Sequence, residues 1–486
     1  MIYFLTSTNR YILLISVNLL IAATGCKKLL AVDPPGNSLN AANVFTTDAT
    51  AIAVVTDIYA GLSAQNINQQ NQAITSLSLY GGLSADEITL FDNSNSFLQP
   101  YFTNDVISTT GSLLWNNAYQ IIFKLNAAIE GLDQSTSITP VVKQQLLGEA
   151  KFMLGFLYFH LVNLYGDVPL VLNTDYIEIA RMSRTPSSKV YDAIIEILTE
   201  AKQLLSADYL KSDLVGSYSA GSEERIRPTK WAAAALLSRA YLYIKNYASA
   251  AAQASEVIGA TSYYGLLPDL TAVFKKNSRD SIWQLQPIGN NANANTGEGK
   301  IFVLPNTGPS ASGYPVYLNT DLVNAFESGD LRREQWVKSV SVGPNTYSYP
   351  YKYQVGNVSA TTQEYSTVLR LSELYLIRAE AKTYLNDVSG AQSDLNLVRK
   401  RAGLGDTPAD DQHTLVTAIL KERRVELFTE WAHRWMDLKR TGTIDVVMSV
   451  ATPQKGGTWQ SYKALLPIPE DELRKALNLR QNPGYN

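Results

Sequence analysis

Asp86 and Glu87 are adjacent carboxylates in a segment, rich in asparagine and serine, that begins at Gly81 and is predicted to form a long loop to about Thr110. Two carboxyl groups about 5 to 9.5 Å apart can hydrolyse a glycosidic bond, one as the acid and the other as the nucleophile or base. Because such pairs need no fixed spacing along a chain, glycoside hydrolysis remains one interpretation of this segment.

The aromatic residues favour binding without cleavage. Tyrosine outnumbers phenylalanine by 28 to 13, and a tyrosine ring offers an apolar face and a polar tip to a partly wet surface. Holding a sugar requires only such faces and a few amide, carboxylate or guanidinium groups. The Gly81–Thr110 segment and residues 259–366 supply both. The predicted ligand-binding residues are Asp86, Phe91, Tyr101, Tyr314, Tyr317 and Trp336.

Motifs for other chemistry are incomplete. Ser217 to Gly221 lacks the first glycine of a G-x-S-x-G elbow, and Gly297-Glu-Gly-Lys300 lacks the upstream glycine of a phosphate loop. The cluster Asp410, Asp411 and His413 is better interpreted as a solvated acidic turn than as a metal site. The other two histidines, His160 and His433, fall inside predicted helices, where packing or a surface position is expected. We expect no catalytic residue, no metal and no cofactor.

The single cysteine, Cys26, follows an apolar run over residues 11–23 that has the length of a signal peptide and is too short to span a bilayer. Ala23-Thr-Gly-Cys26 matches a bacterial lipobox, although leucine is more usual at the first position. We expect residues 1–25 to be removed, Cys26 to be acylated and residues 26–45 to form a tether, so that acyl chains anchor the protein to a membrane. An ordinary secretory signal is the alternative.

The elements that must position these residues are mostly helices. Trp231–Ile258 and Val368–Leu404 each read as two helices joined by a tight turn, with small and apolar residues near the positions that a tetratricopeptide repeat requires. Two ordinary helical hairpins are the alternative. Since a helix pair this short cannot bury its apolar face alone, the pattern predicts similar neighbours stacked against it.

The same periodicity predicts further helices over residues 46–62, 115–132, 139–165, 187–205 and 414–441. Glu422, Glu426, Glu430 and Arg434 lie four residues apart on the last of these, where they are expected to form pairs worth tenths of a kcal/mol. From residue 259 to 366 the helical period disappears, which predicts an insertion of loops and a few strands.

The predicted domain organisation follows from these elements. We expect one mainly α domain over residues 46–486, made of an N-terminal part at 46–258, the insertion at 259–366 and a helical part at 367–486. The hydrophobic content of 45% is typical of a globular chain. A net charge of -3, with 41 basic and 44 acidic residues well mixed, offers no stripe for a polyanion, so a nucleic-acid partner is not expected.

Several stretches together resemble the SusD/RagB family, the surface glycan-binding lipoproteins of Bacteroidetes. The stretches that carry the resemblance are the lipobox at Cys26, Glu149–Leu170, Val368–Leu404, Lys421–Gly442 and Leu465–Tyr485. Trp431-Ala-His433 departs from the family pattern, which more often has a Glu-Gly pair there. The resemblance implies a right-handed scaffold of about four tetratricopeptide-like helix pairs, held over a SusC-like TonB-dependent transporter and presenting oligosaccharide to it.

The leading hypothesis is therefore a non-catalytic glycan receptor, lipid-anchored at the extracellular face of the outer membrane. The lipobox, the helical repeats and the aromatic-bearing insertion motivate it. A surface glycoside hydrolase and a repeat scaffold that binds only protein or peptide are the alternatives.

Overall fold

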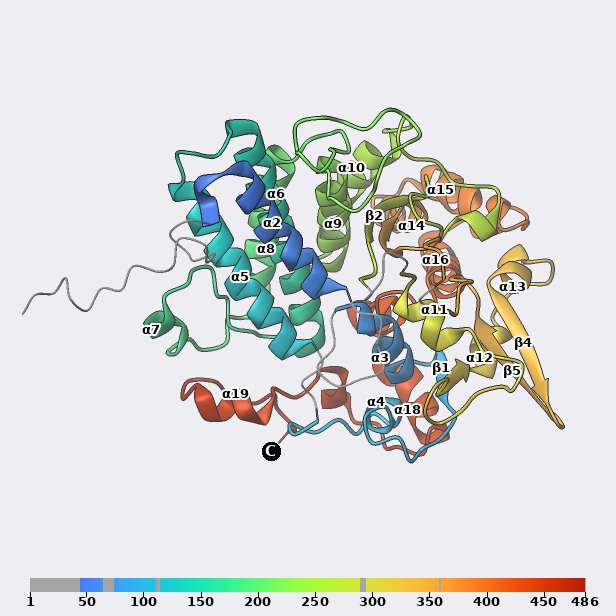
Figure 1. Cartoon of the computed structure of the whole chain (residues 1–486). Helices are drawn as coiled ribbons and strands as arrows, with labels where there is room; N and C mark the ends of the chain where they lie inside the picture. Colours follow the sequence, from blue (N-terminus) through green and yellow to red (C-terminus); the bar gives the residue numbers. More distant parts are fainter. Residues whose placement is uncertain (1–43, 64–73, 111–113, 289–293, 358–359, 486) are drawn as a thin grey trace, which may run out of the picture. The chain divides into compact units, whose positions relative to one another are not determined.

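The computed structural model describes residues 44–63, 74–110, 114–288, 294–357 and 360–485 (Figure 1). The predicted signal peptide, Cys26 and nearly all of the predicted tether lie outside these residues. The chain divides into two units after Val44, and the described α-helices and strands belong to the second, Phe45–Asn486. None of the described helices is both long and apolar enough to cross a membrane.

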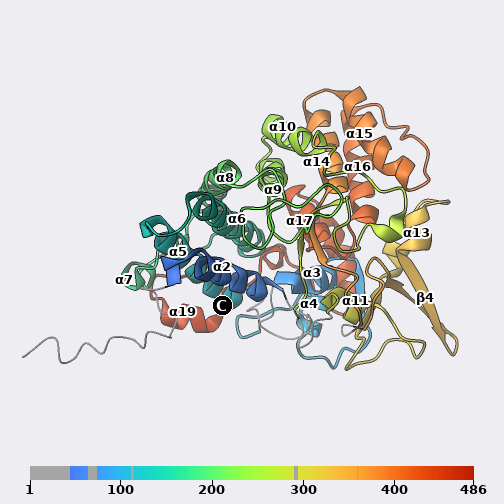
Figure 2. The same cartoon turned by 45° about the horizontal axis from the view of Figure 1, so that its top comes forward.

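A stack of helices forms the scaffold of this unit (Figures 1 and 2). In chain order, the stack contains α5 (Trp115–Gln134), α6 (Pro140–Tyr165), α8 (Ser187–Leu204), α9 (Lys230–Tyr243), α10 (Tyr247–Ile258), α14 (Leu371–Tyr384) and α15 (Val388–Arg401). Each of these helices packs against the next one in the stack. α2 (Asp48–Leu62) covers α5 and α6, and α16 (Gln412–Glu426) covers α14 and α15. The prediction of a mainly α fold built from tetratricopeptide-like helix pairs is confirmed.

The two predicted hairpins are the pairs α9/α10 and α14/α15. In the first, the Ser238 hydroxyl donates to the Ala250 carbonyl at 2.9 Å, so small residues let the two helices approach closely. In the second, Asn386 takes a positive φ of 62° in the turn, and the Asp387 side chain accepts from the Gly390 backbone N–H to begin α15.

Two predicted helix boundaries are wrong. Residues Ser366–Arg370 form strand β6, which pairs with β2 (Ser281–Leu285), so the helix predicted from Val368 begins only at Leu371. The last helix, predicted as one over 414–441, breaks between α16 and α17 (His433–Arg440). Thr429, Trp431 and Ala432 have positive φ angles of 54°, 48° and 60°, which a continuous helix does not allow.

We expected the charges on that last helix to form pairs worth only tenths of a kcal/mol, but Glu422, Glu426 and Glu430 are buried. The Glu426 carboxylate is fully buried and meets three guanidinium groups, those of Arg332, Arg370 and Arg401. Glu430 pairs with Arg370 and with Lys352, whose ammonium group is buried as well. This ionic network ties the insertion to the C-terminal helices.

Short elements fill the rest of the unit. Strand β1 (Ile88–Leu90) pairs with β3 (Val316–Leu318), and β4 (Val337–Val342) pairs with β5 (Asn345–Pro350). The Gly81–Thr110 segment, predicted as a loop, contains the end of α3 (Leu77–Ser84), strand β1 and α4 (Gln99–Phe102). The remaining helices are α7 (Tyr176–Ile179), α11 (Gly297–Phe302), α12 (Thr320–Val323), α13 (Leu331–Gln335), α18 (Ile444–Gln454) and α19 (Glu470–Lys475).

Candidate functional site

Pairing of β1 with β3 brings two predicted binding residues together. Thr89 lies opposite Tyr317 in the ladder, and the Phe91 N–H donates to the Pro315 carbonyl at 2.8 Å. The ring of Tyr347, on β5, meets both rings edge to face, with centroids 5.9 Å from Phe91 and 5.1 Å from Tyr317. We name Phe91, Tyr317 and Tyr347 the aromatic platform.

The platform is open to solvent. Phe91 is 42% exposed, and Tyr317 and Tyr347 are half-buried. Partial burial, and next the neighbouring Tyr347, raise the pKa of the Tyr317 hydroxyl, which therefore stays protonated at neutral pH. Beside Phe91 in the chain, Asp92 accepts from the Ser94 N–H, which lowers the pKa of its carboxyl and keeps it ionised. Ring faces with hydroxyl and carboxylate groups beside them can cover and hydrogen-bond a sugar.

Tyr314 lies at the end of the loop that leads into β3. Its N–H donates to the Ser310 carbonyl at 3.2 Å, and its side chain is half-buried. Among the described residues no ring contact joins it to the platform, so its role as a binding residue stays a prediction.

Three predicted binding residues have buried side chains. Trp336 has no exposed surface, and its indole Nε1 donates to the Leu270 carbonyl at 2.9 Å. Tyr101 is 4% exposed and packs against Tyr80. Asp86 is buried and accepts from Arg424 and Arg434. Their side chains pack in the core or form buried ion pairs, and little of their surface is exposed to solvent.

Sequence reasoning did not include Tyr347 among the candidate binding residues, although the structure places its ring against Phe91 and Tyr317. The signal was available, because Tyr347, Tyr349 and Tyr351 alternate along the chain, and alternate residues of a strand share one face. What the sequence could not supply was the partner strand that decides which face is exposed.

The carboxylate pair Asp86 and Glu87 lies in a tight, charged environment. Burial acts to raise the pKa of Asp86, but the hydrogen bonds and charges of Arg434 and Arg424 outweigh it and lower the pKa. Burial and the adjacent Asp86 raise the pKa of Glu87 to about 8. The cavity beside Glu87 measures about 20 Å³, which holds a water molecule and no sugar ring. This pair does not offer the open cleft that glycoside hydrolysis needs.

His160 and the acidic turn at Asp411 make contacts that stabilise the fold. Burial lowers the pKa of His160 to about 3, and its Nδ1 lies 2.9 Å from the Phe156 carbonyl. Asp411 and Thr414 form a reciprocal capping box at the start of α16, as expected of a solvated turn. No cluster of three metal-binding side chains occurs in the part of the chain that the structure describes.

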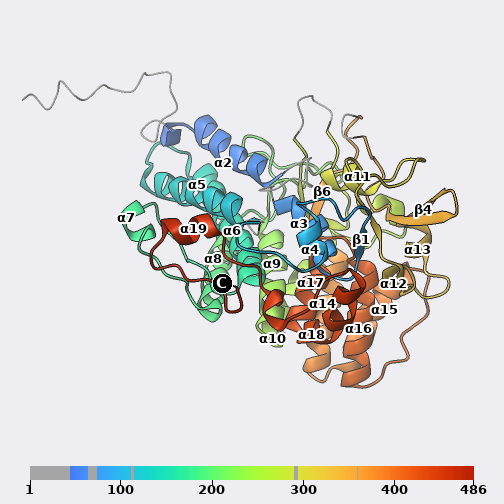
Figure 3. The same ribbon diagram turned by 90° about the horizontal axis from the view of Figure 1, so that it is seen from below.

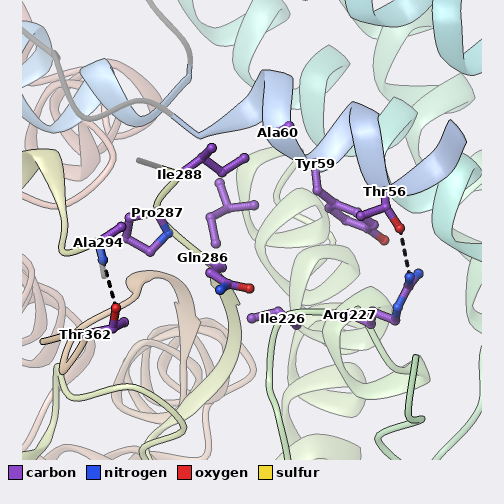
Figure 4. A pocket seen from close by; sticks show the side chains of 11 residues that line it. Thr56, Tyr59, Ala60, Ile226, Arg227, Gln286, Pro287, Ile288, Ala294 and Thr362 are labelled. Carbon is purple, nitrogen blue, oxygen red and sulfur yellow. Dashed lines mark hydrogen bonds between the residues drawn. The ribbon is translucent and has the colours of Figure 1, made fainter. Parts of the chain in front are cut away.

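A larger cavity, of about 330 Å³, shares no lining residue with the platform and is drawn in Figure 4. It is bounded by one face of α2, by the residues just before α9, by the segment that follows β2, and by Ala294 and Thr362. Its lining residues are Thr56, Tyr59, Ala60, Ile226, Arg227, Leu285, Gln286, Pro287, Ile288, Ala294 and Thr362.

Two family models match the chain. Residues 38–242 match a model described as "Starch-binding associating with outer membrane", and residues 337–485 match the model of the SusD family. Together they cover more than half of the sequence. The chain belongs to the SusD/RagB family. The SusD-like protein P2 of Formosa agariphila is 27% identical to it over 96% of this chain and 98% of the relative.

Solved SusD structures share the fold. A SusD superfamily protein from Bacteroides vulgatus superposes with a TM-score of 0.76 at 18% identity, covering 90% of this chain and 99% of the other. A structure described as a laminarin binding SusD-like protein gives a TM-score of 0.71 at 24% identity, with the same coverage. Within this SusD/RagB chain, Phe91 and Tyr347 lie inside the matched segments, whereas Tyr317 lies between them.

Proposed function

We propose that this protein is a non-catalytic, surface-exposed binding lipoprotein that captures oligosaccharide and delivers it to a SusC-like TonB-dependent transporter. The observation that carries the proposal is the aromatic platform. Three rings, each on or next to a different strand, converge at one exposed place, with hydroxyl and carboxylate groups next to them. Such a surface fits the alternating apolar faces and hydroxyl edges of a glycan chain.

The relatives support a carbohydrate ligand. One family model that matches this chain is described as starch-binding, and one SusD-like structure with the same fold is described as laminarin binding. The same model description names association with the outer membrane, which agrees with acylation at Cys26. Capture by rings, without a carboxylate pair in an open cleft at Asp86 and Glu87, suits delivery of an intact glycan.

Affinity electrophoresis against a panel that includes starch and laminarin tests the proposal. We expect retardation by at least one glycan. Tyr347→Ala or Phe91→Ala removes a ring contact worth about 1 to 1.5 kcal/mol, so each variant is expected to bind roughly tenfold more weakly. Phe123→Ala is the matched control, because Phe123 is 49% exposed on α5 and lies outside the platform.

The result also separates the alternatives. Cleavage of a glycan by the wild-type chain, detected as new reducing ends, contradicts the non-catalytic proposal. Binding to none of the glycans, together with recovery of soluble proteins alone from a pull-down, supports a protein-binding scaffold instead. Recovery of a TonB-dependent transporter from detergent-solubilised membranes supports the delivery role.

A further inference from the structure

We propose that the 330 Å³ cavity beside α2 is a second carbohydrate site, which takes a neutral sugar unit of one or two rings. This proposal rests on the proposed function only in its assumption that the protein binds glycans. At about 330 Å³ the cavity is at the lower end of the roughly 300–1,000 Å³ range of small-molecule pockets. That size suits a chain end or a short product, and excludes a long glycan.

The charge of the cavity wall selects a neutral ligand. The Arg227 guanidinium donates from Nη1 to the buried Glu149 carboxylate at 2.7 Å and from Nη2 to the Thr56 hydroxyl at 3.0 Å (Figure 4). The Tyr59 hydroxyl donates to the same carboxylate at 2.8 Å. Because Glu149 neutralises this cation, an anionic ligand gains little there. The guanidinium is instead held in place beside the cavity.

Other lining groups can recognise sugar hydroxyls. The Gln286 amide makes no hydrogen bond among the described residues, and its side chain is exposed at the cavity. The Thr362 hydroxyl accepts from the Ala294 N–H at 2.8 Å and keeps its own hydrogen to donate. An amide and a hydroxyl are the kinds of group that orient a ligand in a mostly apolar pocket.

Apolar side chains complete the cavity. Leu285 and Pro287 are buried beneath it, and Ala60 and Ile226 form half-buried parts of its wall. A sugar ring has one face made mainly of C–H groups, which such a wall covers without leaving a hydroxyl unpaired. The lining therefore matches a ring with one apolar face and a polar edge.

The cavity is distinct from the aromatic platform. The two share no residue, and α2 lies apart from β4 and β5 in all three views of the molecule (Figures 1, 2 and 3). A substitution in one site therefore leaves the contacts of the other intact. This separation makes the two proposals independently testable.

The test uses the full mature chain and saturation-transfer NMR with maltose, cellobiose and laminaribiose as neutral probes and glucuronate as the anionic one. Ala60→Trp fills the cavity from α2, and Gln286→Leu removes the free amide at similar size. We expect wild type to bind at least one disaccharide in preference to glucuronate. Ala60→Trp is expected to weaken that binding at least tenfold, and Gln286→Leu about threefold.

The controls are Ala53→Trp, on the exposed side of the same helix, and Phe123→Ala on α5, outside both sites, and both are expected to leave disaccharide affinity within twofold. The proposal is overturned if no disaccharide binds to wild type, or if Phe91→Ala abolishes disaccharide binding while Ala60→Trp does not change it. If a long glycan still retards the protein in affinity electrophoresis in either of these cases, the platform proposal is not affected. If wild type binds neither a disaccharide nor a long glycan, both proposals are rejected.

Discussion

Asp86 and Glu87 are consecutive residues with opposite electrostatic surroundings. Asp86 is held ionised by two guanidinium groups, those of Arg424 and Arg434. Glu87 turns into the core, where its Oε2 accepts from the Thr429 N–H at 3.2 Å and its Oε1 has no hydrogen-bond partner among the described residues. Burial beside the charged Asp86 disfavours a second negative charge, so the neutral form of Glu87 is the stable one in the folded chain.

Glu87→Gln is predicted to remove a pH dependence of stability. Burial raises the pKa of the Glu87 carboxyl to about 8, whereas an unfolded glutamate titrates near about 4.3. Between these values the folded state binds more protons than the unfolded state, so this residue's contribution to stability falls as pH rises. We expect the variant to match wild type near pH 5 and to be the more stable protein near pH 9.

Urea unfolding at a series of pH values measures this difference. Glu334→Gln is a suitable control, because Glu334 is exposed on the short helix α13 and its carboxylate forms no ion pair with any described residue. Parallel pH profiles for wild type and Glu87→Gln would show that the Glu87 carboxyl does not titrate in this range.

Glu426→Gln is predicted to destabilise the fold severely. Burial alone acts to raise the pKa of this carboxyl, but the charges of Arg401, Arg370 and Arg332 lower the pKa well below its usual range. Removing one partner of a buried ion pair costs about 3–5 kcal/mol, because it leaves charge uncompensated. The control Asp192→Asn breaks an exposed pair with Lys189 and is expected to cost less than about 1 kcal/mol. Equal unfolding midpoints for the two variants would contradict the assignment of a buried network.

The same residues show where sequence reasoning ends. Spacing by four placed Glu422 and Glu426 on one face of a helix, and that much was predictable, whereas Glu430 lies in the break that follows α16. Whether the face meets water or arginine depends on Arg332 and Arg370, which come from the insertion and from β6. Likewise, composition could nominate Trp336 and Phe91 equally, and only packing decides that one is core and the other exposed.

Among the helices, the break between α16 and α17 packs closely against a glycine of a different helix, α3. Gly81 of α3 faces Ala432, and a Cβ atom at Gly81 would lie 2.2 Å from the Ala432 Cβ and 2.6 Å from its Cα. Ala432 has a left-handed backbone with a φ of 60°. The close approach of α3 therefore depends on the absence of a side chain at residue 81.

Gly81→Ala is predicted to destabilise the protein by about 1–3 kcal/mol, because the added methyl group forces α3 away from the α16–α17 break. The control is Gly405→Ala, where nothing lies within 4 Å of the added atom, and a change within about 0.5 kcal/mol is expected there. Thermal unfolding of the two variants beside wild type makes the comparison. A tolerated Gly81→Ala would mean that α3 and the break can separate without cost.

Helical hairpins were predictable from the sequence, whereas the strands were largely not. The pairs α9/α10 and α14/α15 are marked by a local period of three and four residues and by turn residues such as Asn386. Strand β1 is three residues long and finds its partner, β3, far along the chain. A local pattern does not encode such a pairing, and the platform depends on it.

For the whole molecule, we predict separate tasks for the amino-terminal segment and the helical unit. The platform and the cavity are built entirely from residues of the second unit, Phe45–Asn486. Cys26, by contrast, lies outside the described residues and is predicted to carry the acyl chains. Glycan affinity in the purified protein and attachment to the membrane should therefore be separable.

We predict that mass spectrometry of the protein extracted from membranes finds its first residue to be Cys26, with acyl chains on it. Each buried methylene contributes about 0.8 kcal/mol, and one chain binds only marginally, so two or three chains are needed for a lasting anchor. A chain that carries Cys26→Ser and an ordinary secretory signal in place of residues 1–25 is expected in the soluble fraction, with unchanged affinity for glycan. Attachment of this variant that withstands a high-salt wash would show that something other than acyl chains holds the protein, and a weaker affinity would show that the anchor shapes the binding surface.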